Sequence, residues 1–139
     1  IDYNLLKQVR RDYVQNMVES DYVLCCRGLG NYSFRLYEAL SCGRIPVLIN
    51  TDCVLPYDFW IDYKDYCIWV EEREISDLPE IVADFHARLS PQAFIAHQQN
   101  CRALWEHYLS PRGFFSNLHR HLQDLGLISS KLCQVSLRP

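Results

Sequence analysis

The spacing of apolar residues predicts a helix at the start of the chain and two buried strands after it. Residues 4–19 carry apolar side chains at helical intervals, at Leu5, Leu6, Val9, Tyr13, Met17 and Val18. Residues 22–26 then form a short continuous apolar run, which is typical of a strand buried on both faces of a sheet. Residues 45–49 form the next buried strand, and Pro46 is compatible with it only near its start.

The segment between these strands predicts a turn followed by a helix. Gly28, Gly30 and Asn31 interrupt the apolar run, and Asn31 or Ser33 is expected to cap the next helix through its side-chain oxygen. The helix is expected to end near Gly43, because glycine is favoured just beyond a helix C-terminus. Strand, turn, helix and strand in this order form a βαβ unit.

The second half of the chain is mostly helical in pattern. A polar turn over residues 50–58 leads to a third strand at 66–70 and then to an acidic segment. A capping-box pattern at Asp77 and Glu80 and two Ser-Pro pairs predict three helices, at residues 78–89, 91–109 and 111–124. Residues 129–139 show no clear period. We therefore expect a single α/β domain over residues 1–139: a Rossmann-like half with a small parallel sheet flanked by helices and a helix-rich C-terminal part.

Composition and charge exclude several classes of protein. The chain of 139 residues is 49% hydrophobic and 22% charged, which is the composition of a globular domain. Its net charge of −3 comes with no dense basic stripe, so we expect no nucleic-acid partner. No apolar run approaches the roughly 18 residues of a membrane span, and no signal peptide is visible. Because the chain does not begin with Met, we expect it to be a fragment of a longer protein.

The cysteines and histidines do not have the spacing of a metal site. The seven cysteines include no CxxC pair, and the histidines have no carboxylate or Cys at ligand spacing. Unpaired thiols suit a reducing compartment, and Cys25 and Cys67 are expected to be buried in strands. All five histidines fall in predicted helices and are expected to face solvent: His86, His97, His107, His119 and His121.

Two loops follow the carboxyl ends of the first two predicted strands, at residues 27–33 and 50–55. Open α/β sheets bind their ligands at these ends of the strands. In the first loop, Gly28 and Gly30 allow the backbone to bend tightly and to bring N–H groups close to a phosphate. This loop is therefore a candidate anion site.

Charged residues beside this loop suit a nucleoside diphosphate. Arg27 and Arg35 carry forked donors that match phosphate oxygens, and the helix N-terminus adds a partial positive charge. Glu38 lies about one turn after Arg35 on nearly the same helix face, where its carboxylate can accept hydrogen bonds from both ribose hydroxyls. This pair predicts a site for the diphosphate and ribose of an activated sugar.

Less specific interpretations of the same residues stay open. Arg35 and Glu38 could form a helix-surface ion pair worth about 0.2–0.5 kcal/mol, and the two glycines could belong to an ordinary turn. The run GLGNYS lacks the third glycine of the dinucleotide fingerprint, which argues against a nicotinamide or flavin. No hydrolase, zincin or P-loop motif is present. No Asp-x-Asp pair is present to hold a divalent metal on a diphosphate, so positive side chains and the helix terminus would have to neutralise it.

The run YVLCCRGLGNYSFRLYEALSCGRIPVLINTDCVLP, residues 22–56, resembles the exostosin family of glycosyltransferases. Members of that family carry a similar apolar strand, an R-G turn, an S-F-R-x-x-E-A-L helix, a G-x-I-P-V strand and a following L-P. The match has no gap, although Cys26 stands where many members have proline. The later run WVEEREISDLPEI resembles the next strand, acidic turn and helix of the family.

The resemblance implies the GT-B architecture, in which two Rossmann-like domains face each other across a cleft. This chain would be the C-terminal, donor-binding domain, and the missing N-terminal domain would supply the catalytic base. The implied reaction is an inverting, metal-independent transfer from a nucleoside diphosphate sugar, above all a UDP-sugar, to a saccharide acceptor, with no further cofactor. By position, Arg35 would bind the diphosphate and Glu38 the ribose, and the phosphate turn would be lined by Arg27, Gly28, Asn31 and Ser33. Because such a transfer needs both walls of the cleft, the isolated chain is expected to be inactive.

Two alternatives to an enzyme stay open. An inactive relative of the same fold could bind a glycan or a protein partner. An oligomeric scaffold could use aromatic residues such as Trp60, Trp69 and Trp105. The free thiols favour the cytoplasm of a bacterium, whereas a eukaryotic member of the family would be expected in the Golgi lumen.

Overall fold

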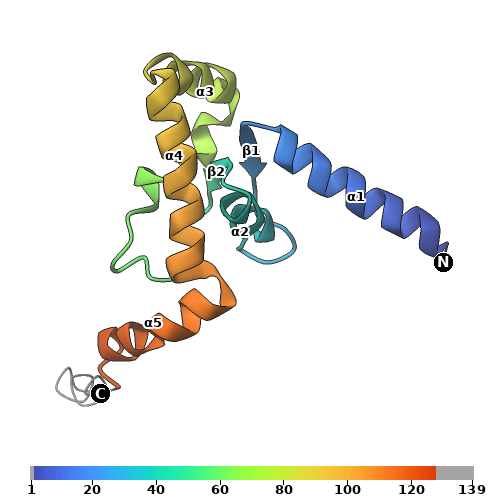
Figure 1. The fold of residues 1–139 in the computed structure, drawn as a ribbon. Coiled ribbons are helices and arrows are strands. Elements are labelled where there is room, and N and C mark those ends of the chain that lie inside the picture. Colours follow the sequence, from blue (N-terminus) through green and yellow to red (C-terminus); the bar gives the residue numbers. More distant parts are fainter. Residues whose placement is uncertain (1, 128–139) are drawn as a thin grey trace.

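A computed structural model describes residues 2–127 of the protein (Figure 1). One sheet holds three parallel strands in chain order, β1 (Tyr22–Cys25), β2 (Ile45–Asn50) and β3 (Ile68–Glu71). The α-helices are α1 (Tyr3–Glu19), α2 (Phe34–Ser41), α3 (Leu78–Ala87), α4 (Pro91–Leu104) and α5 (Pro111–Asp124). Two 3₁₀ helices, η1 (Tyr63–Asp65) and η2 (Glu72–Asp77), and one π-helix, η3 (Trp105–Leu109), complete the order. The α/β class with a small parallel sheet flanked by helices is confirmed, and the predicted irregular segment 129–139 lies outside the described residues.

The central strand, β2, lies in the hydrophobic core. In β2, residues 45–49 are all buried, as predicted. In β1 the burial alternates, and Leu24 keeps 49% of its surface exposed, so the prediction of a first strand buried on both faces is wrong. The reason is position: β1 pairs only with β2 and lies at an edge of the sheet, where one face is left partly open.

Helix α2 packs on β1 and β2 and ends as the sequence predicts. Gly43 follows the C-cap residue with a φ of +63°, in the left-handed region that glycine adopts without strain. A Cβ at this position would lie 3.3 Å from the carbonyl oxygen of Gln98 on α4. Arg102 of α4 also donates to the carbonyl oxygen of Ser41, so a cation satisfies the end of α2.

The helix starts follow the predicted signals in two cases out of four. Ser90 caps α4 by accepting from the amide of Ala93 at 3.1 Å, and Ser110 caps α5 by accepting from the amide of Gly113 at 3.0 Å. In contrast, Asp77 makes no side-chain cap, because the acidic segment before it has already coiled into η2. The helix predicted over 91–109 is α4 continued by the π-helix η3.

The loop after β2 is not the polar turn that the sequence predicts. Leu55 and Tyr57 are buried within it, and Tyr57 is fully enclosed with a φ of +60°. The Tyr57 hydroxyl donates to the carbonyl oxygen of Phe114 at 2.6 Å, which fastens the loop to α5. Local polarity could not predict this burial, because α5 lies more than fifty residues further along the chain.

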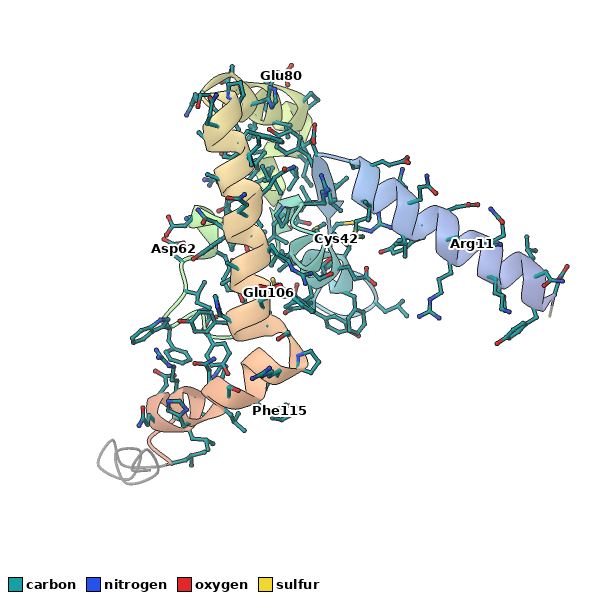
Figure 2. All side chains as sticks on the ribbon, viewed as in Figure 1. Arg11, Cys42, Asp62, Glu80, Glu106 and Phe115 are labelled. Carbon is teal, nitrogen blue, oxygen red and sulfur yellow. The ribbon has the colours of Figure 1, made fainter. Side chains whose placement is uncertain are left out.

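Helix α1 projects from the body of the molecule (Figures 1 and 2). Met17 is its only buried residue, and Tyr13 is partly buried beside the core. Asp2 caps its first turn through hydrogen bonds from the amides of Asn4 and Leu5. Among the helices of residues 2–127, none has both the length and the apolarity that crossing a membrane requires.

Candidate functional site

Two loops meet at the carboxyl edge of the sheet and are joined through Asn31. The Asn31 side-chain nitrogen donates to the carbonyl oxygen of Thr51 at 2.9 Å, and its Oδ1 accepts from the Thr51 hydroxyl at 2.6 Å. The predicted phosphate turn is thereby held against the loop that follows β2. Asn31 is occupied by this link and does not cap α2.

The turn itself is open to solvent. Arg27 and Gly28 are exposed, and the Gly28 amide donates to the carbonyl oxygen of Tyr32 at 3.2 Å. The backbone bends over residues 29–31, as predicted, although neither Gly28 nor Gly30 has a left-handed φ. A Cβ at Gly30 would instead collide with the ring of Tyr32. A larger residue at position 30 would therefore require the exposed Tyr32 ring to move.

Ser33 lies at the N-cap position of α2 but does not cap it. Its side chain accepts no hydrogen bond from the first turn, and only 8% of its surface is exposed. The prediction that Asn31 or Ser33 caps this helix through its side chain is therefore wrong. The amides that begin α2 have no side-chain cap from Ser33.

Arg35 and Glu38 lie one turn apart on α2, and both are exposed. In the described part of the chain they form no ion pair with each other. A third side chain bridges them: the Tyr13 hydroxyl donates to Glu38 Oε2 at 2.5 Å and accepts from Arg35 Nε at 3.3 Å. The Arg35 guanidinium also lies 4.9 Å from the centre of the Tyr13 ring. The simple helix-surface ion pair that the sequence left open is not formed.

The surroundings of Tyr13 keep its phenol protonated. Burial, and then the hydrogen bond to Glu38, raise the pKa of Tyr13. The hydrogen bond with Tyr13 raises the pKa of Arg35 in turn. At neutral pH the phenol is therefore a donor to Glu38 and the guanidinium is charged. Within residues 2–127, the two terminal nitrogens of Arg35 and Oε1 of Glu38 have no hydrogen-bonding partner.

A second polar group stands at the ends of β2 and β3. Glu71 accepts from Asn50 Nδ2 at 2.9 Å and from the indole nitrogen of Trp69 at 3.0 Å. These two hydrogen bonds, that from Asn50 first, lower the pKa of Glu71. This group is not among the residues that the sequence predicts, although polar residues end both strands.

Two of the five histidines are structural, contrary to the expectation that all face solvent. His97 Nε2 lies 3.0 Å from the carbonyl oxygen of Tyr66, and His121 accepts from the amide of Tyr57 at 3.3 Å. Both are partly buried. His86 is exposed, but its Nδ1 lies 2.8 Å from the Tyr22 hydroxyl. These contacts join helices to strands and loops.

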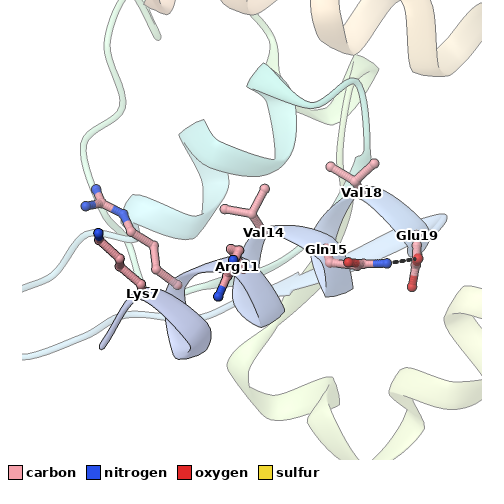
Figure 3. A pocket seen from close by; sticks show the side chains of 7 residues that line it. Lys7, Arg11, Val14, Gln15, Val18 and Glu19 are labelled. Atoms are coloured by element: carbon pink, nitrogen blue, oxygen red, sulfur yellow. Dashed lines mark hydrogen bonds between the residues drawn. The ribbon is translucent and has the colours of Figure 1, made fainter. Parts of the chain in front are cut away.

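A hollow of about 680 Å³ runs along another side of α1 (Figure 3). Helix α1 alone lines it, through Lys7, Arg10, Arg11, Val14, Gln15, Val18 and Glu19. Tyr13 is not among these residues. The predicted donor residues Arg27, Arg35 and Glu38 do not line this hollow and are exposed to solvent.

The most informative residue that the sequence analysis missed is Tyr13. It was assigned only to the apolar stripe of the first helix. Its contacts with Arg35 and Glu38 span 22 and 25 residues of chain. A local sequence pattern cannot predict which side chain of α1 lies beside α2, because these contacts depend on the tertiary fold.

Several known proteins are similar in sequence to this chain. Exostosin-1 of Drosophila melanogaster is 38% identical over 99 residues, which cover 71% of this chain and 12% of that protein. A probable beta-1,4-xylosyltransferase of Arabidopsis thaliana, IRX10, is 31% identical over 94 residues, which cover 66% of this chain and 23% of that protein. A probable glucuronosyltransferase of Oryza sativa, Os04g0398600, is 36% identical over 70 residues, which cover 50% of this chain and 17% of that protein.

The matched part of the chain spans less than a quarter of the length of each of these relatives. They come from a fly and two plants, so they give no support to the expectation of a bacterial cytoplasmic protein. The family model of the Exostosin GT47 domain matches residues 2–85, which include Tyr13, Arg35, Glu38 and the whole sheet. Because that match covers more than half of the sequence, this chain belongs to the exostosin GT47 family.

Proposed function

We propose that this chain is the donor-binding half of a glycosyltransferase that moves a sugar from a nucleoside diphosphate sugar to a saccharide acceptor. One observation carries the proposal. Arg35 and Glu38 stand one turn apart beside the phosphate turn, and each keeps hydrogen-bonding groups free for a ligand. Membership of the exostosin family and the names of the xylosyl- and glucuronosyltransferase relatives support the same class of reaction.

The free groups match the parts of a nucleoside diphosphate. The terminal nitrogens of Arg35 bind the diphosphate and stabilise the negative charge that grows on it as the sugar leaves. Oε1 of Glu38 accepts from a ribose hydroxyl, since an ionised carboxylate only accepts hydrogen bonds. The exposed guanidinium of Arg27 adds positive charge at the turn.

The proposed transfer is a single displacement with inversion. An acceptor hydroxyl oxygen forms a bond to the anomeric carbon while the bond from that carbon to the diphosphate oxygen breaks. The acceptor proton passes to a base on the facing N-terminal GT-B domain, which we propose as the second wall of the cleft. Arg35 and the start of α2 neutralise the leaving group, so the reaction requires no divalent metal.

The proposed compartment is the Golgi lumen, as the family resemblance implies for a eukaryotic member. Microscopy of the tagged full-length protein beside a Golgi marker tests this location. A purely cytosolic signal contradicts it.

Titration calorimetry with uridine diphosphate and guanosine diphosphate tests the donor site. Arg35→Ala is expected to weaken binding at least about tenfold, because it removes charge-assisted hydrogen bonds to phosphate. Arg88→Ala is the matched control, since Arg88 is the C-cap residue of α3 and forms an exposed pair with Asp84. Binding that is absent in the unaltered chain, or equally weakened by both variants, contradicts the proposal.

A ligand that lacks the ribose hydroxyls tests the proposed contact with Glu38. Glu38→Ala is expected to weaken binding of uridine diphosphate several-fold. The same substitution should have little effect on 2′,3′-dideoxyuridine diphosphate, which offers no vicinal hydroxyls. An equal loss for both ligands contradicts the assignment of Glu38 to the ribose.

A further inference from the structure

Helix α1 reaches the candidate donor site through one polar side chain. Most of the helix is exposed, and its apolar residues Leu5, Leu6 and Val9 each keep more than half of their surface open. Only Met17 is buried in the core. Tyr13, one turn before Met17, is the residue of α1 that contacts Arg35 and Glu38. A tyrosine in this place therefore does more than add apolar surface.

The Tyr13 hydroxyl donates one hydrogen bond and accepts one. Its single proton goes to Glu38 Oε2, and one of its oxygen lone pairs receives the Nε–H of Arg35. The ring lies beside the guanidinium at 4.9 Å. One phenol thus fixes two long charged side chains that make no direct pair with each other.

The groups that Tyr13 uses are not the groups that a ligand needs. It takes Nε of Arg35 and leaves both terminal nitrogens, which form the fork that grips a phosphate. It takes one oxygen of Glu38 and leaves the other. Binding therefore need not displace the tyrosine, and both charged side chains are ordered before a ligand arrives.

We infer that Tyr13 is a positioning residue of the donor site, whose hydroxyl holds Arg35 and Glu38 in the orientation that grips the diphosphate and ribose of a nucleotide. This inference rests on the proposed function of the same site. Its ligand class is the nucleoside diphosphate, and Tyr13 acts on it only through the two charged residues.

Titration of the chain with uridine diphosphate tests the inference through Tyr13→Phe, which keeps the ring and removes the hydroxyl. We expect affinity to fall by roughly threefold to tenfold, as for one lost hydrogen bond. Tyr3→Phe is the matched control on the same helix, because Tyr3 is exposed and lies ten residues before Tyr13. The thermal midpoint of each variant, measured in parallel, checks that the fold is intact.

A double variant separates positioning from a merely structural role. If the hydroxyl acts through Glu38, then Tyr13→Phe should weaken binding much less in a Glu38→Ala background than in the unaltered chain. A loss of equal size in both backgrounds overturns the inference. Unchanged affinity in Tyr13→Phe overturns it too, and so does tighter binding, which would mean that Tyr13 competes with the ligand.

The failure of the proposed function has a different outcome. If uridine diphosphate does not bind the unaltered chain, or if Arg35→Ala binds it normally, the donor site and the role of Tyr13 are both overturned. If Arg35→Ala abolishes binding while Tyr13→Phe leaves it unchanged, the donor site stands and only the inference about Tyr13 falls.

Discussion

Asn31 and Thr51 form a double hydrogen bond across the carboxyl edge of the sheet, with one bond to the Thr51 carbonyl and one from its hydroxyl. These residues belong to different loops, one after β1 and one after β2. Their link holds the predicted phosphate turn against the loop after β2, whereas Ser33 does not cap the helix that follows the turn.

Replacing Asn31 should therefore loosen the turn more than it unfolds the domain. Asn31→Ala is expected to cost about 1 kcal/mol of stability, since water replaces part of both exposed hydrogen bonds. Uridine diphosphate affinity should fall several-fold. Thr51→Val, which keeps the carbonyl acceptor, should have the smaller effect of the two. Calorimetry measures the affinity of each variant and thermal melting measures its stability. Asn100→Ala, at an exposed position of α4, is the control. Unchanged affinity in Asn31→Ala would show that the link is dispensable.

Substitution of two glycines should affect stability in one case and nucleotide affinity in the other. Gly43 has a φ of +63° and packs against Gln98, so Gly43→Ala is expected to lose at least about 1 kcal/mol of stability. Gly28 has no left-handed φ, and a Cβ there meets nothing within 4 Å. Gly28→Ala should therefore keep or slightly raise the thermal midpoint and yet weaken nucleotide binding, because the added carbon crowds a phosphate at the turn. If Gly28→Ala binds normally, the backbone of the turn does not approach the ligand.

Signals that depend on a few neighbouring residues predicted the fold well. The Ser-Pro pairs at Ser90 and Ser110 and the glycine at Gly43 were read correctly, because caps are satisfied by amides and carbonyls within one turn. The continuous apolar run of β2 likewise predicted its burial on both faces.

Features that depend on tertiary position could not be predicted in this way. Leu24 looks like a core residue, but its strand lies at the edge of the sheet. Tyr57 looks like part of a polar turn, but α5 covers it. Arg35 and Glu38 were found as candidates from their helical spacing, whereas Tyr13 was not, because no local rule gives the direction in which α1 leaves the sheet.

The cysteines should differ sharply in reactivity. Burial raises the pKa of Cys25 and of Cys101 to about 12, and it also raises the pKa of the buried Cys67. Cys26 is exposed beside the turn. A disulfide reagent at pH 8 is expected to label Cys26 quickly and these three buried thiols only after unfolding. Cys26→Ser should lower the amplitude of the fast phase by one thiol, and rapid modification of Cys25 would contradict the burial of that residue.

The same raised pKa values give stability a pH dependence. Below about pH 8.5 the buried thiols are protonated in both the folded and the unfolded chain. Between that pH and about 12 the unfolded thiols lose protons while Cys25 and Cys101 keep theirs, so the folded chain binds more protons. Stability must then fall as pH rises through this window. Urea unfolding at pH 7.5 and 9.5 measures the fall, and Cys101→Ala should reduce it. An equal slope in that variant would assign the dependence to other groups.

Nucleotide binding should not depend on a divalent metal. Arg35, Arg27 and the start of α2 supply the positive charge at the proposed site. We expect the same affinity for uridine diphosphate in excess EDTA and in magnesium, because these groups would already neutralise the diphosphate. Glu71→Gln provides the control, since Glu71 is the carboxylate that ends β3 and accepts from Asn50. Binding that needs magnesium and is lost in Glu71→Gln would move the site to the ends of β2 and β3 and remove Arg35 from its central role.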